Sequence, residues 1–222
     1  LHSLLHEVYS KINSNKSNTF DSESVFKRAL KNKILFYLGA VQGYEEIISK
    51  QYYESSLMTD VESALTVACT YQHSSYLELL SDFYNKWKHD NLVMNKWLTI
   101  QANTCQGSSS VEELSALELN EVYNKFEPNK VRALWGTFMK NSAQYHRLDG
   151  QGYEKIINLV VELDHYNPQI ASRIARGFDE YNKLDVPRKK IFKKYFEKVD
   201  FEKLSVNTFE IMNNIKNHMM DN

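Results

Sequence analysis

The chain has 222 residues and a formal net charge of −1, from 27 Lys and Arg against 28 Asp and Glu. With 42% hydrophobic and 25% charged residues it has an ordinary soluble-protein composition, long enough for one sizeable core or an extended helical array. The charge balance provides no global field to attract nucleic acid or anionic lipid, and no stretch reaches the ~18 apolar residues of a membrane span. We therefore expect neither nucleic acid nor a membrane as a partner.

The first residues predict a helix that is already under way at the start of the chain. The segment has no initiator Met and no signal-peptide pattern. Its apolar residues recur at helical spacing, at Leu1, Leu4, Leu5, Val8 and Ile12. We expect this sequence to be a fragment of a larger protein.

Most of the remaining chain also has helical periodicity. Residues 13–24, rich in Asn and Ser, are expected to form a flexible loop, and capping-box patterns are predicted at residues 59–62 and 110–113. With only 7 Gly and 3 Pro there are few breaks. Helical stripes are predicted at 25–38, 59–71, 76–87, 92–102, 128–138, 153–164, 168–181, 186–199 and 205–219.

These elements amount to about eleven helices joined by short polar turns, and no alternating run long enough to predict a strand is present. The aromatic residues are spread over many helices, as expected where each helix packs only on its neighbours. The predicted fold is all-α, an irregular superhelical array (α-solenoid) of antiparallel helix pairs. We expect a single helical domain over residues 1–222.

The two cysteines have no partner in the sequence pattern. Cys69 lies four residues after Leu65 and is expected in the core, and Cys105 is expected at a helix end. Two unpaired thiols fit a reducing compartment better than a disulfide framework. The expected location is cytoplasmic.

The sequence contains no convergent set of catalytic or metal-binding residues. His6-Glu7-Val8-Tyr9-Ser10 begins like the HExxH zinc motif but has Ser where the second His is required. His2 and His6 stand four residues apart, which leaves open a metal site or a plain surface helix, and we favour the surface helix. We therefore predict no catalytic residue, no metal ligand and no cofactor within this chain.

Two further motifs have structural and functional interpretations. Asp149-Gly150-Gln151-Gly152-Tyr153 lacks the preceding strand of a nucleotide loop, so its glycines are expected to permit positive φ in a turn before a helix. Residues 187–194 form a dense basic run. It could bind nucleic acid, but its apolar residues favour an amphipathic helix with the lysines in water.

Residues 167–173, Asn-Pro-Gln-Ile-Ala-Ser-Arg, have the pattern of a helix entrance. Asn167 is suited to the N-cap and Pro168 to the first helical position, with Gln169 and Arg173 on the opening turns. The unpaired N–H groups of such a terminus can receive an anionic or carbonyl oxygen.

Six segments, in order, resemble the C-terminal region of the zinc-dependent aminopeptidase N (alanyl aminopeptidase) family of the bacterial type. The family pattern typically has Asn and Asp where this chain has Leu57 and Asn95, and neither position is expected to contact substrate. The segments are residues 27–32, 58–65, 86–97, 128–134, 149–153 and 167–173.

The resemblance implies a non-catalytic C-terminal domain that closes the active-site chamber of a zinc metallo-aminopeptidase. Zinc and the general-base Glu would belong to the catalytic domain of the same polypeptide, so this fragment alone is expected to be inactive. Gln169 would line the pocket for the N-terminal side chain of a peptide substrate, and Arg173 and Arg132 would face the leaving-peptide side.

Other interpretations of these residues stay open at the level of sequence. The two arginines could only bridge neighbouring helices, and Gln169 could only belong to a helix start. The alternative function is a free-standing α-solenoid that binds a partner protein; a helical array that binds nucleic acid would rest on the basic run alone.

Overall fold

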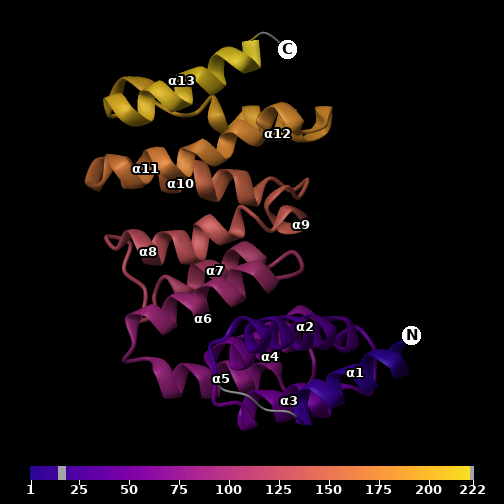
Figure 1. Ribbon diagram of the computed structural model, residues 1–222. Helices are drawn as coiled ribbons and strands as arrows, with labels where there is room; N and C mark the ends of the chain where they lie inside the picture. Colours follow the sequence, from indigo (N-terminus) through magenta and orange to yellow (C-terminus); the bar gives the residue numbers. More distant parts are fainter. Residues whose placement is uncertain (15–18, 221–222) are drawn as a thin grey trace. The chain divides into compact units, whose positions relative to one another are not determined.

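The structure, a computed structural model, describes residues 1–14 and 19–220 (Figure 1). These residues form α-helices with short 3-10 and π-helical segments, and no strand occurs among them. The predicted all-α helical array is confirmed. No helix in this described part is both long and apolar enough to cross a membrane.

The chain divides into two compact units, Leu1–Ile100 and Gln101–Asn222. Unit 1 packs α1 on α2, α3 on α4, α2 on α4 and α4 on α5. Its fully buried apolar residues include Leu35, Leu38, Leu65, Leu79 and Phe83. Its helices are α1 (His2–Ser14), α2 (Ser22–Gly39), α3 (Glu45–Glu54), α4 (Met58–Thr70), α5 (Tyr76–Trp87) and the larger part of α6 (Asn91–Thr104).

A buried polar network joins four helices of unit 1 around Asp60. Lys31 Nζ lies 2.6 Å from Asp60 Oδ2, and both side chains are more than 90% buried. Asn32 donates to Asp60 Oδ1 at 2.8 Å, Gln51 donates to the Asp60 carbonyl at 3.0 Å, and Tyr9 donates to Gln51 at 2.9 Å. Two of the family-like segments, at 27–32 and 58–65, thus meet in one structural network.

Both predicted capping boxes are wrong. Helix α4 begins at Met58, one residue before Thr59, and the apolar side chain of Leu57 at the N-cap cannot accept a hydrogen bond. Glu62, the other member of the predicted box, accepts a hydrogen bond from Lys96 instead. Helix α7 (Ser110–Leu117) follows Ser109, which also caps no backbone N–H, and Ser110 Oγ instead donates to the Gly107 carbonyl. Long-range and turn hydrogen bonds outcompeted the local pattern in each case.

Unit 2 packs α10 against α7, α11 and α12, and α13 against α11 (Figure 1). Its elements after α7 are α8 (Pro128–Val131), the π-helical η1 (Arg132–Gly136), α9 (Ser142–Tyr145), α10 (Gln151–Tyr166), α11 (Pro168–Ala175), the 3-10 segment η2 (Arg176–Lys183), α12 (Val186–Phe196), the 3-10 segment η3 (Phe201–Lys203) and α13 (Val206–Met220).

The core of unit 2 is a connected series of aromatic rings. Tyr145, Tyr153 and Phe192 follow one another with ring centroids 5.3 and 5.2 Å apart, and Phe192 in turn contacts Phe178 and Phe196. All five side chains are buried. Since aromatic rings prefer such edge-to-face and offset geometries, this series holds α9, α10, η2 and α12 in one arrangement.

Several element boundaries differ from prediction. The expected loop at 13–24 is shorter, since α1 extends to Ser14 and α2 begins at Ser22; residues 15–18 lie outside the described residues. The helix predicted at 168–181 changes to 3-10 geometry at Arg176, beside Gly177, a residue of low helix propensity. Cys69 is buried and Cys105 follows the end of α6, as predicted. The single domain over residues 1–222 stays a prediction.

Candidate functional site

The entrance of α11 has the predicted construction. Asn167 is the N-cap and its Oδ1 accepts a hydrogen bond from the Ile170 N–H at 3.1 Å, with Pro168 at the first helical position. Pro fits there because its fixed φ suits the helix and its missing N–H leaves no donor unpaired. Ile170, Ala171, Ile174 and Ala175 are buried. The apolar face therefore holds the helix in place and leaves its polar face outward.

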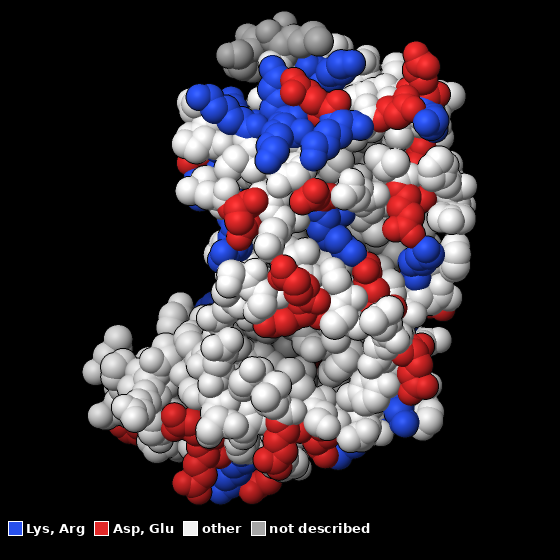
Figure 2. Space-filling model, turned by 180° about the vertical axis from the view of Figure 1, so that it is seen from behind, with Lys and Arg blue, Asp and Glu red and all other residues white. Residues whose placement is uncertain are grey.

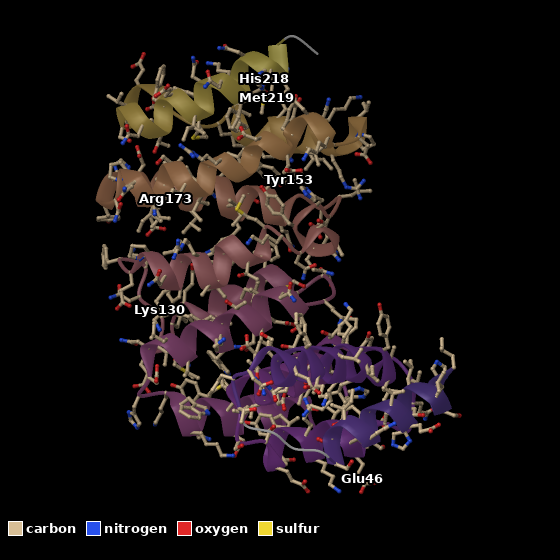
Figure 3. All side chains as sticks on the ribbon, in the orientation of Figure 1. Glu46, Lys130, Tyr153, Arg173, His218 and Met219 are labelled. Carbon is tan, nitrogen blue, oxygen red and sulfur yellow. The ribbon has the colours of Figure 1, made fainter. Side chains whose placement is uncertain are left out.

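Gln169 and Arg173 occupy that outward face, one turn apart. Both residues are exposed, and within the described part of the chain neither side chain has a hydrogen bond or an ion pair. Arg173 lies on α11 as Figure 3 shows. A guanidinium without a carboxylate partner keeps all five N–H donors available for an incoming oxygen atom.

Arg132 lies at the beginning of η1 in the same unit. It is exposed, and its Nη2 donates to Asn129 Oδ1 at 2.6 Å, a contact within a single helical turn. The π-helical segment that it begins departs from regular α geometry, and such segments are frequent at functional sites. No carboxylate partner of Arg132 occurs among the described residues.

The surroundings of two glycines show that the segment after Arg132 lies beside α11 and the start of η2. A Cβ atom at Gly136 would lie 3.8 Å from Ile174 Cδ1, and one at Gly177 would collide with Met139 Cε. Position 136 lies near residue 174, and position 139, three residues later, lies near residue 177. Because both numbers increase together, the two segments run parallel. Extended backwards, this register places Arg132 at the level of the first turn of α11. The structure thus brings the three predicted residues to neighbouring helices at one end of those helices.

Arg176 is a fourth polar residue of this region that the sequence prediction did not include. It follows Arg173 by three residues, is exposed, and has no side-chain partner in the part that the structure describes. The i,i+3 spacing from Arg173 was the available signal. Three guanidiniums and the N-terminus of α11 make the local potential positive, while Asp179, exposed three residues later, limits the positive region.

The glycine-rich turn before α10 is confirmed as a turn, but its glycines have different roles. Gly150 has φ of +76°, as predicted. Gly152 has no positive φ; it is required because a Cβ atom would lie 2.5 Å from the Tyr145 carbonyl oxygen. The turn therefore sets the close approach of α9 to α10, the helix on which α11 packs.

A polar link supports the same turn. The Tyr153 hydroxyl lies 2.9 Å from His146 Nδ1, and Arg188 Nε donates to the His146 carbonyl at 2.7 Å. Burial, together with the Arg188 charge, lowers the pKa of His146, and burial raises the pKa of Tyr153 to about 12. Both shifts favour the neutral forms, so this hydrogen bond joins a neutral imidazole and a neutral phenol.

No group of three or more His, Cys, Asp and Glu side chains suited to a metal ion occurs in residues 1–14 and 19–220. His2 and His6 are exposed on α1, and the His6 ring contacts that of Tyr44 at 5.5 Å. The donor set of the zinc site implied by the family therefore does not fit the described residues.

The basic run at 187–194 forms most of α12. Phe192 and Phe196 are buried on one side, while Lys190 and Lys194 are exposed on the other. Figure 2 shows Lys and Arg side chains gathered over the C-terminal helices of unit 2. The interpretation as an amphipathic helix is confirmed.

Comparison with known proteins finds one matching family model and several related sequences. Residues 1–217 match a family model described as a domain of unknown function (DUF3458_C) with ARM repeats. Aminopeptidase N of Haemophilus influenzae is 30% identical over 190 residues, which cover 85% of this chain and 22% of that protein. Aminopeptidase N of Escherichia coli is 30% identical over 213 residues, 93% of this chain and 24% of that protein.

A solved structure shows the same fold. The crystal structure of Legionella pneumophila aminopeptidase A in complex with aspartic acid matches 96% of this chain and 26% of its own chain, with a TM-score of 0.87 and 24% identity. This chain spans about a quarter of the length of the relatives that it matches. The predicted resemblance to the aminopeptidase N family is confirmed, and the chain belongs to the DUF3458_C family of ARM-repeat domains.

Proposed function

We propose that this chain is a non-catalytic domain of a zinc metallo-aminopeptidase, a hydrolase that removes N-terminal residues from peptides. The domain would close the active-site chamber and contribute to peptide binding. The aminopeptidases N among its relatives support the activity. The proposed partners are the catalytic domain of the same polypeptide and peptide substrates, and the two free cysteines support a cytoplasmic location.

The peptide-binding role is supported above all by the exposure of Arg173 and by its lack of a carboxylate partner among the described residues. Its exposed guanidinium has no carboxylate partner in the described part of the chain and lies on the second turn of a capped helix. A planar guanidinium can hold a carboxylate or carbonyl oxygen pair bidentately, and the helix N-terminus adds to the attraction. Arg173 and Arg132 would bind the leaving-peptide side, and Gln169 would contact the N-terminal side chain of the substrate.

The hydrolytic chemistry would come from the catalytic domain. A bound zinc ion there would supply an activated water and polarise the scissile carbonyl. The residues of this chain would bind and orient the peptide and enclose the chamber. The isolated chain is accordingly expected to hydrolyse neither peptides nor aminoacyl amides and to bind no stoichiometric zinc.

The test uses Arg173→Ala in the full-length protein that contains this chain. Loss of a charge-assisted hydrogen bond worth roughly 1.5–3 kcal/mol lowers kcat/KM for a peptide about tenfold to a hundredfold or somewhat more. The loss should be smaller for a small chromogenic aminoacyl amide, which has no peptide chain on the leaving side. Arg173→Lys should recover little activity if the contact is bidentate.

Lys190→Ala is the control, since it removes an equal exposed charge from α12, a helix that contains none of the four site residues. It should leave peptide hydrolysis unchanged. Equal losses for both substrates together with a lowered melting temperature would identify Arg173 as a structural residue. A full-length protein that hydrolyses neither substrate would instead favour the alternative, a free-standing protein-binding scaffold.

A further inference from the structure

A cavity in unit 2 lies between the end of α12, η3 and the end of α13, on elements other than those of Arg173 and Arg132. Its volume is about 260 Å³, and Phe196, Val199, Phe201 and Met219 form its apolar walls. Met219 lies near the C-terminal end of α13 (Figure 3). Since a cavity of about 150 Å³ lined by apolar side chains holds benzene, this one has room for a large apolar side chain.

Charged groups of both signs stand at the rim of this cavity. Lys216 lines it and has no carboxylate partner in the described part of the chain; its Nζ lies 4.6 Å from the centre of the Phe201 ring. Lys193 and Glu197 also line it, and their charged atoms are 3.8 Å apart. Their side chains are 45% and 63% exposed, so this ion pair is weak and can be exchanged for other partners.

This arrangement matches the three chemical groups of one class of small molecule. We propose that the cavity binds a free hydrophobic α-amino acid, with the side chain between Phe196 and Met219, the carboxylate on Lys216 and the ammonium on Glu197. An apolar amine without a carboxylate would be repelled by the two lysines at the rim, and an apolar carboxylate without an ammonium group would be repelled by Glu197. The zwitterion satisfies charges of both signs, and a pocket of apolar walls with few polar groups is the usual form of a small-molecule site.

The test follows the methyl signal of Met219 by NMR in the full-length protein, labelled with ¹³C in its methionine methyl groups and assigned with Met219→Leu. L-Phenylalanine and L-leucine should shift this signal saturably, and glycine should not. Phenethylamine and 3-phenylpropionate, which each lack one charged group, should bind about threefold to tenfold more weakly, as expected for an ionic contact at a partly exposed rim.

Matched variants test each contact. Lys216→Gln and Glu197→Gln should each weaken L-phenylalanine binding about threefold to tenfold. Lys190→Gln and Glu202→Gln change exposed residues of α12 and η3 that do not line the cavity, and they should have no effect. Val199→Trp should fill the cavity and abolish the shift; the two rim variants carry the test if this one does not fold.

Two results would overturn the inference. One is a Met219 signal that does not move with L-phenylalanine up to about 10 mM, well above the concentration that saturates a specific weak site. The other is equal affinity in the rim variants and their controls. Binding of an amino acid at a site that does not contact Met219 would leave its signal unmoved, so this readout can succeed or fail independently of the proposed function.

Discussion

The two units bury different kinds of side chain at their centres. Unit 1 places a lysine, an aspartate and two amides in its interior, around Asp60, within a mostly aliphatic core. Unit 2 instead has a series of packed aromatic rings, with Phe192 in contact with four of them. The polar network and the aromatic series each hold together helices that are distant in sequence.

The difference shows how two helical arrays from one chain can be specified. Hydrogen bonds are directional, so the Asp60 network tolerates one register of α2, α3 and α4. Aromatic rings are held in place by close packing, so the stability of the unit 2 core depends on how completely the rings fill its volume. Removing one member should therefore leave an unpaired charge in unit 1 but a gap in unit 2.

The largest effect is expected from Asp60→Ala in unit 1. The variant leaves the Lys31 ammonium buried without its partner and removes the acceptor of Asn32. Breaking a buried ion pair in this way costs about 3–5 kcal/mol of unfolding free energy. Urea denaturation followed by circular dichroism measures the loss, and hydrogen exchange assigns it to unit 1.

Glu23→Ala provides the control for that comparison. It breaks the Lys27–Glu23 pair, which lies on the surface of the same helix α2. Exposed pairs contribute less than about 1 kcal/mol, so this variant should be nearly neutral. Similar small losses for Asp60→Ala and Glu23→Ala would show that the buried network is dispensable.

A smaller loss is expected from Phe192→Leu in unit 2. The side chain stays apolar, but the edge contacts with Tyr153 and Phe178 are lost and a gap remains. The expected cost is about 1–3 kcal/mol. Phe209→Leu, at a residue that is 42% exposed, should change stability by less than about 0.5 kcal/mol. A neutral Phe192→Leu would contradict the role assigned to the rings.

Tyr153→Phe tests the polar link within the aromatic core. It keeps the ring but removes the hydroxyl that is hydrogen-bonded to His146 Nδ1, at an expected cost of about 0.5–1.5 kcal/mol. Tyr145→Phe is the matched control, because the Tyr145 hydroxyl is buried and has no hydrogen-bond partner in the described part of the chain. That variant should be neutral or slightly stabilising. Thermal melts compare the stability of the two variants, and equal destabilisation would contradict a stabilising role for the Tyr153–His146 hydrogen bond.

The smallest expected effect is a pH dependence of unit 2. The pKa of His146 in the folded chain lies below its ordinary value near 6.5, so the unfolded chain takes up the proton first as the pH falls. His146 therefore favours the folded state fully above about pH 6.5 and loses this contribution towards its lower folded pKa. Unfolding free energies at about pH 7.5 and 5.5 should differ less in His146→Gln than in the parent protein. An unchanged difference would rule out this contribution.

Features that depend on residues within about one helical turn were predictable from the sequence. The 3.6-residue periodicity predicted the helices, Asn167 and Pro168 predicted the entrance of α11, and the turn at Gly150 was expected to have positive φ. Gln169 and Arg173 on one face of that helix followed from their spacing of four residues. Their contact with substrate stays a prediction.

What depends on distant residues was decided by the tertiary structure. Glu62 fits a local capping pattern, yet its carboxylate accepts a hydrogen bond from Lys96, 34 residues away. The Asp60 carboxylate likewise binds Lys31 and Asn32, 29 and 28 residues away. Gly152 is explained by the Tyr145 carbonyl across a turn, and the level of Arg132 beside α11 by the contact of Gly136 with Ile174. Such contacts form only once helices pack, because burial then makes an unpaired charge or a misplaced Cβ costly. The sequence by itself therefore determined the helices and the family, and packing decided which polar residues became part of the buried structure and which remained exposed.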